Sequence, residues 1–249
     1  MADGFMNYEI DPKQAYPLVQ IYLEYGERAR ISRGSMVYHS TGVQLNTKLN
    51  SKTGLLGALG RSMTSGESAF ITEVVSSEPN GFVALAPNVP GEIVALEIGA
   101  NQYRINDGAF LAMDGSRANY HMERQKLSKA FFGGQGGLFV MTTEGEGTIL
   151  CNAFGSVQKI EVSGTPITID NAHVIAWDVN LDYNIHLENG FFQSIGTGEG
   201  VVNTFHGHGT VWVQTLNLET FGAALSRYIG ESSGGKSGKG ALDFIGSFN

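Results

Sequence analysis

Short apolar runs that end at glycines or turn pairs occur along most of the chain, and this pattern predicts strands. In the run Val211–Leu216, apolar and polar residues mix, β-branched side chains are frequent, and a glycine lies just upstream. Runs of the same character are Phe82–Ala86, Ile149–Phe154 and Val201–Phe205. Such runs are typical of half-buried strands joined by hairpins. We therefore predict an all-β fold that is mainly antiparallel.

One combination of turn and strand occurs three times. Ile31, Ile105 and Ile169 are separated by 74 and 64 residues, and each precedes a turn pair and a strand-like run. The turn pairs are Arg33–Gly34, Asp107–Gly108 and Asn171–Ala172. The three segments agree both in the residues of the turn and in the positions of the apolar residues that follow it. We therefore predict three repeats, at about 28–97, 103–162 and 167–216. They would form a β-sandwich or barrel-like body with pseudo-threefold symmetry; the alternative is unrelated hairpins that are alike only in composition.

A helix is predicted after the last repeat, over about 217–229. Asn217 is suited to cap its first turn, and Gly230 is suited to end it. Its apolar residues share one face: Phe221, Ala224, Leu225 and Tyr228. Residues 231–249 are rich in Gly, Ser and Lys, which is typical of a flexible tail. The prediction is a single β-rich domain, 1–230, followed by that tail.

The composition excludes several functions. The chain has 249 residues, of which 34 are Gly and 42% are hydrophobic, enough apolar material for a large core. Its net charge of −8 argues against nucleic acid as the main ligand. Its single cysteine, Cys151, excludes an intramolecular disulfide. The sequence contains neither a secretory signal nor an apolar span of about 18 residues, so we expect a cytoplasmic protein.

Several glycine-rich strings resemble those of a known family. They are Gly34–Val37, Gly54–Leu59, Phe132–Phe139, Thr197–Val202 and Gly209–Gln214. Over about 29–229 the chain is similar to the altered inheritance of mitochondria family, whose prokaryotic members have no known function. The resemblance implies a β-rich fold with pseudo-threefold repeats, similar to the tryptophan RNA-binding attenuation protein. It also implies homo-oligomers, often trimers, and supplies no catalytic residues.

Two glycine clusters match nucleotide-binding patterns in the wrong context. Residues 230–237 satisfy the Walker A pattern, but they follow the predicted helix and lie in the tail, with no strand before them. Residues 133–137 lead into a predicted strand, whereas a dinucleotide site requires a strand, a helix and a second strand. We interpret the first as linker composition and the second as glycines that permit tight turns. No cofactor is predicted.

The histidines offer only a weak metal site. His206 and His208 flank one glycine on a predicted turn, but a metal centre usually has three or four protein ligands. His173 and His186 lie in a stretch that also contains acidic residues: Asp178, Asp182 and Glu188. Sequence alone does not bring these groups together. We therefore predict no metal site and interpret His206 and His208 as surface residues of a turn.

No set of residues predicts catalysis. Cys151 lies in an apolar strand, where a buried inert thiol is the usual case. Asp114 and Asp178 occupy matching repeat positions, which favours a structural role at strand ends over an acid–base pair. Aromatic residues with basic neighbours could stack bases, namely Tyr22, Tyr25, Arg28 and Arg30, but the chain lacks a basic cluster. The enzyme interpretation is therefore the least supported.

Together these features predict a non-enzymatic binding or assembly protein that forms a homo-oligomer, most simply a trimer. The segment 50–64, with its glycines and neighbouring basic residues, is the candidate contact for a membrane surface or a protein partner. The alternative is a small-ligand sensor with a pocket between repeats. The two differ in a measurable way, since only the second predicts stabilisation by a metabolite.

Overall fold

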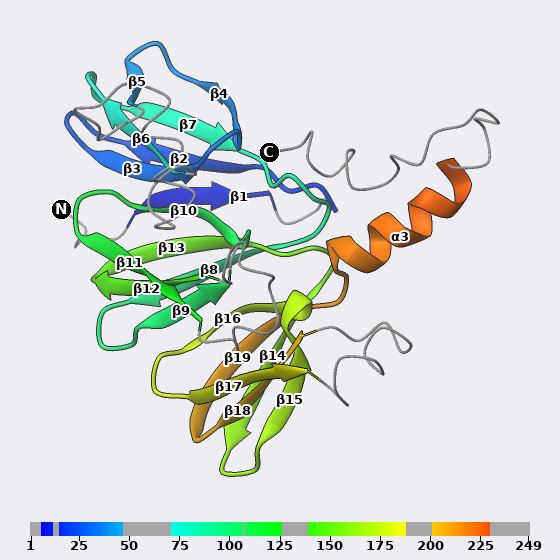
Figure 1. Ribbon diagram of the computed structural model, residues 1–249. Coiled ribbons are helices and arrows are strands. Elements are labelled where there is room, and N and C mark those ends of the chain that lie inside the picture. The colour runs from blue at the N-terminus through cyan, green and yellow to red at the C-terminus, as the bar shows by residue number, and fades with distance from the viewer. Residues whose placement is uncertain are drawn as a thin grey trace, which may run out of the picture.

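The computed structural model describes residues 6–11, 15–46, 71–106, 108–125, 139–187 and 201–229. Most of these lie in antiparallel strands, which form four open, sandwich-like sheets, and one helix follows the last strand (Figure 1). The predicted all-β antiparallel fold with a C-terminal helix is confirmed. No sheet among the described strands closes on itself, so the barrel-like form of the prediction is not found there.

The strand order defines the four sheets. The first contains, in order, β1 (Asn7–Ile10), β2 (Val19–Leu23), β7 (Gly81–Leu85) and β4 (Met36–His39). The second contains β5 (Val43–Asn46), β6 (Ile71–Ser76), β3 (Arg28–Ser32), β10 (Phe110–Asp114), β13 (Gly147–Asn152) and β8 (Ile93–Ile98). The third contains β11 (Ala118–Arg124), β12 (Phe139–Gly145), β9 (Tyr103–Asn106), β16 (Val174–Asp178), β19 (His208–Gln214) and β14 (Val157–Ser163). The fourth contains β15 (Ile167–Asp170), β18 (Val201–His206) and β17 (Asp182–Leu187).

One pairing pattern recurs in three segments of the chain, 19–85, 93–152 and 157–214. In each segment the last strand lies between the first and the third and pairs with both, which gives the strand orders β2–β7–β4, β8–β13–β10 and β14–β19–β16. The other three strands of each segment also pair alike: β5–β6–β3, β11–β12–β9 and β17–β18–β15. We call residues of different segments equivalent when they occupy the same position in this pairing pattern, as Ile31, Ile105 and Ile169 do.

A register shift interrupts the third strand of each segment at the same place. The shift lies between Met36 and Tyr38 in β4 and is repeated at the equivalent residues of β10 and β16. The skipped residues are Val37, Leu111 and Ile175. A β-bulge produces such a shift and turns the skipped side chain away from the regular alternation.

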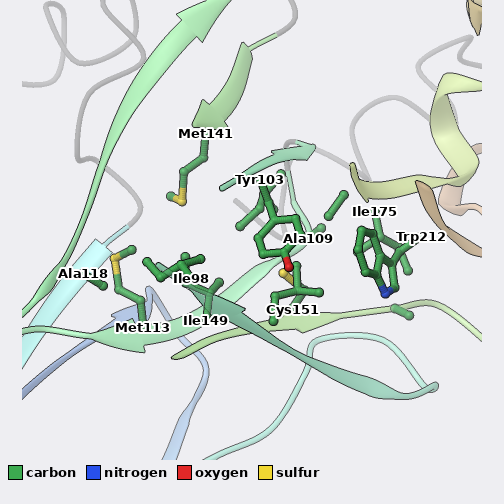
Figure 2. Packing of buried hydrophobic residues seen from close by; sticks show 14 residues of the cluster. Ile98, Tyr103, Ala109, Met113, Ala118, Met141, Ile149, Cys151, Ile175 and Trp212 are labelled. Atoms are coloured by element: carbon green, nitrogen blue, oxygen red, sulfur yellow. The ribbon is translucent and has the colours of Figure 1, made fainter. Parts of the chain in front are cut away.

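The core is continuous across segment boundaries. Leu111, Ala112 and Leu150 of the second segment are fully buried in the core of the first. At equivalent positions, Ile175, Ala176 and Trp212 of the third segment are buried in the core of the second (Figure 2). The ring of Trp212 packs edge-on against Tyr103, with 5.4 Å between ring centroids. The cores of the first and second segments therefore each include three buried side chains supplied by the next segment.

Candidate self-association site

The junctions between segments are built by strand pairing in one register. At the first junction β3 pairs with β10, and Ile31 lies opposite Ala112. At the second junction β9 pairs with β16, and Ile105 lies opposite Ala176. The remaining pairs match as well: Arg30 with Met113, Ala29 with Asp114, Arg104 with Trp177, and Tyr103 with Asp178. One junction geometry is thus used twice within the chain.

An arginine secures each junction. The Nη1 of Arg30 donates to the carbonyl of Ala118 at 3.1 Å, and the Nη1 of Arg104 donates to the carbonyl of Val179 at 2.9 Å.

The residues considered for base stacking make similar internal contacts. Arg28 forms an ion pair with Glu73 at 3.2 Å, and the hydroxyl of Tyr22 donates to Glu9. Three of the four residues considered for base stacking thus make contacts within the protein.

Two strands that are equivalent to junction strands have a free edge. β4 is equivalent to β10 and β16, whereas β15 is equivalent to β3 and β9. Within the described residues, β4 pairs only with β7 and β15 pairs only with β18. The two strands lie at opposite ends of the molecule, β4 at the top and β15 at the bottom of Figure 1. A single chain therefore presents both halves of a junction without joining them.

The side chains along these two edges are exposed where their equivalents are buried. Val37 is 53% exposed, whereas its equivalents Leu111 and Ile175 are at most 1% exposed. Tyr38 is 44% exposed, and the equivalent alanines of β10 and β16 are fully buried. Ile169 is only partly buried, although Ile31 and Ile105 are buried. The exposed apolar area lies where a third junction would cover it.

The helix α3 (Leu218–Ile229) starts as predicted but is scarcely buried. Asn217 caps it, because its Oδ1 accepts a hydrogen bond from the Thr220 N–H at 2.8 Å. Phe221 packs edge-on against Phe154 at 5.1 Å between ring centroids. Leu218, however, is 62% exposed, so the apolar face extends beyond the contact with the sheets.

A cavity of about 460 Å³ lies beside the start of α3 and the short helix η1 (Asn171–His173). Its lining residues are Asp170, His173, Thr215, Leu216, Asn217, Thr220, Phe221 and Ala224. The ring of His173 is held by two hydrogen bonds: its Nδ1 donates to the carbonyl of Gln214, and its Nε2 accepts from the Nδ2 of Asn217. This cavity lies between the third segment and the helix, rather than between two segments.

The structure does not gather the histidines into one site. His206 and His208 are exposed and flank Gly207, and they face different strands, with Asp182 opposite the first and Ser163 opposite the second. His173 precedes β16, whereas Asp178 ends it, so the two lie at opposite ends of that strand. Among the described residues, no three His, Cys, Asp or Glu side chains are placed to hold a metal ion.

The other candidate groups have structural surroundings. Asp114 accepts hydrogen bonds from the backbone N–H groups of Ser116 and Arg117, and Asp178 accepts one from Thr210 at 2.6 Å. Burial raises the pKa of Cys151 to about 12, which leaves an unreactive thiol. The segments 50–64, 133–137 and 230–249 lie outside the described residues.

One charged cluster was not predicted from the sequence. On β11 and β12, the ring of His121 lies between two carboxylates, at 2.9 Å from Glu123 and 2.6 Å from Glu144. The hydrogen bond with Glu123, supported by Glu144, raises the pKa of His121 despite partial desolvation. The alternation of His121 and Glu123 along a strand hinted at this, but the contribution of Glu144 depends on the pairing of β11 with β12.

The raised pKa of His121 predicts a pH-dependent contribution to stability. It should be complete below the ordinary histidine pKa of about 6.5 and decline as the pH rises through the raised value. We expect His121→Gln to destabilise the protein at pH 5.5, by less than about 1 kcal/mol because the ring is half exposed. Urea unfolding at pH 5.5 and 8.5 measures the difference, with His208→Gln as the control. An equal effect of His121→Gln at both pH values would contradict the prediction.

The geometry defines a class of all-β proteins in which the second and third segments supply side chains to the core of the segment before them. Residues 8–216 match the family model described as Mitochondrial biogenesis AIM24, and the chain belongs to this family. An uncharacterised protein of Streptococcus pyogenes serotype M6 is 61% identical over 237 residues, which cover 94% of this chain and 95% of that protein. The crystal structure of a Streptococcus pyogenes protein is also 61% identical, with a TM-score of 0.80, and the match covers 90% of this chain and 99% of that one.

In the part of the chain that the structure describes, no helix combines the length and the apolar composition needed to cross a membrane.

Proposed function

We propose that this chain is a non-enzymatic assembly protein that associates with copies of itself through β4 of one copy and β15 of the next. The observation that carries the proposal is the junction that occurs twice inside the chain in one register. Transferred to the free edges, that register places Tyr38 opposite Ile169 and His39 opposite Thr168. An aromatic residue opposite a β-branched one is a favourable cross-strand pair.

Pairing of the two edges would complete the sheets. The half-sheet β1–β2–β7–β4 would join the half-sheet β15–β18–β17, in the same strand order as the two six-stranded sheets. Val37 and Tyr38 would then cover the core of the third segment, which among the described residues receives no side chains from a following segment. Burying each of these side chains contributes roughly 1.5–3 kcal/mol before the cost of association is counted.

The contact is heterologous, because two different edges meet, and a heterologous contact forms a ring when its rotation closes. The proposal therefore includes a closed homo-oligomer, with a trimer as the simplest form, and a fold like that of the tryptophan RNA-binding attenuation protein. It also includes three repeats in the chain, made of the strands from β2 to β7, from β8 to β13 and from β14 to β19. Each of these repeats begins about ten residues before the bounds predicted from the sequence, 28–97, 103–162 and 167–216. A cytoplasmic location and a partner contact through residues 50–64 stay predictions.

Sedimentation velocity of the full-length protein over a concentration series tests the assembly. We expect a discrete species with a mass that is a multiple of the 26.7 kDa chain. A particle that stays monomeric at the highest concentration would overturn the proposal.

A second candidate function, binding of a small ligand, is favoured by the cavity beside α3. Its volume of about 460 Å³ falls within the range of small-molecule sites. A screen of metabolites by thermal shift would support this candidate if one of them raises the melting temperature, since a ligand of the native state stabilises it. Loss of that shift in Phe221→Ala would place the ligand in this cavity.

A further inference from the structure

We infer that Asp170 of one copy and Arg33 of the next form an ion pair that fixes the order of the copies. This inference rests on the proposed self-association through β4 and β15. It names the residues that distinguish the junction between copies from the two junctions inside the chain.

The second internal junction supplies the template. Asn106 ends β9 and is a buried residue, 8% exposed. Its Nδ2 donates to the carbonyl of Asn171 at 2.8 Å and to that of Val174 at 3.1 Å. The side chain at the end of one strand is thus tied to the corner from which the partner strand starts.

The equivalent residues at the free edges carry opposite charges. Asp170 ends β15 as Asn106 ends β9. The corner before β4 contains Arg33 and leads into Met36, the equivalents of Asn171 and Val174. Transfer of the template therefore places the Asp170 carboxylate against the corner that contains Arg33.

A carboxylate cannot replace the amide of Asn106 at such a corner unless a neighbouring group supplies hydrogen-bond donors. It has no hydrogen to donate and would be repelled by the carbonyl oxygens of Arg33 and Met36. The guanidinium of Arg33 supplies the missing donors from the same corner, and it matches a carboxylate in geometry as well as charge. The charged pair of Asp170 and Arg33 would thus take the place of the neutral contact made by Asn106, and the contact would require both residues.

Both groups are available for this contact. Arg33 is exposed, Asp170 is partly buried, and neither forms an ion pair within the described residues. The Oδ1 of Asp170 accepts a hydrogen bond from the Ala172 N–H at 2.9 Å, which orients the carboxylate and leaves Oδ2 without a protein donor there. The first internal junction has Ser32 at this position, so the acidic residue occurs only where the copies would meet.

Charge exchange tests the pair. Arg33→Glu and Asp170→Lys should each weaken assembly by roughly tenfold or more, because each leaves two like charges facing one another. The double variant, Arg33→Glu with Asp170→Lys, should recover most of the assembly. Asp182→Lys, an exposed charge reversal on β17, is the matched control. Sedimentation velocity measures assembly, and circular dichroism checks that each variant is folded.

The outcomes separate the inference from the proposal on which it rests. A wild-type protein that stays monomeric would overturn both. Normal assembly of both single variants would overturn the ion pair and leave the edge pairing in place. Weakened single variants without recovery in the double variant would also overturn the pair, since they would show independent local effects. Recovery in the double variant, with an unaffected Asp182→Lys, would support it.

Discussion

Replacing Val37 by lysine is expected to abolish the proposed self-association and leave folded monomers. In the single chain Val37 is 53% exposed, so a lysine there reaches water and the fold is kept. In the assembly the residue would take the place that Leu111 and Ile175 have in the internal junctions, where both are buried. Burying an unpaired ammonium group costs several kcal/mol, and about 3 kcal/mol corresponds to a more than hundredfold weaker association.

A concentration series by sedimentation velocity measures this loss. Tyr25→Lys is the matched control, because Tyr25 is 75% exposed and lies in a turn away from both free edges. The control should assemble like the wild type. Assembly of Val37→Lys at wild-type concentrations would show that the β4 edge is not the contact.

Truncation of Trp212 should cause the largest loss of stability. Trp212 belongs to the third segment but is buried in the core of the second, against Tyr103 (Figure 2). Trp212→Ala leaves a large cavity in that core, and such substitutions cost about 3–5 kcal/mol. Because the ring joins two segments, we expect both to unfold together at a lower denaturant concentration.

Urea unfolding measures this change, and the Val37→Lys background keeps assembly from contributing to it. Leu218→Ala is the control, because Leu218 is 62% exposed on α3, and it should change the stability by less than about 0.5 kcal/mol. A loss below about 1 kcal/mol for Trp212→Ala would mean that the ring contributes little to the junction.

The sequence was sufficient for local structure. The turn pair after Ile31 predicted the strand that follows it, because tight turns depend on the chemistry of adjacent residues. The strand after Ile169 also forms where it was predicted, but Asn171–His173 before it form a short 3-10 helix rather than a two-residue turn. The helix was predicted within one residue of its bounds, Leu218–Ile229, because Asn217 caps it through a contact three residues away. These features are set by neighbours in the chain.

The candidate site could not be predicted in the same way. Val37 and Leu111 look alike in sequence, and only strand pairing over long separations makes one exposed and the other buried. The cluster around His121 likewise needs the register of β11 against β12. Single-residue patterns do not contain that register, since it follows from the whole sheet. His206 and His208, separated in sequence by one glycine, lie opposite different strands for the same reason.

The skipped residue in β4, β10 and β16 has a consequence for the size of the assembly. A bulge bends its strand and increases the local twist. The same bulge at every junction would turn each repeat by the same angle relative to the one before it, within a chain and between chains. The curvature of a closed assembly would then be a property of the repeat, and the number of chains would follow from how many repeats each one contributes. A chain with more or fewer repeats would close the same circle with a different number of copies.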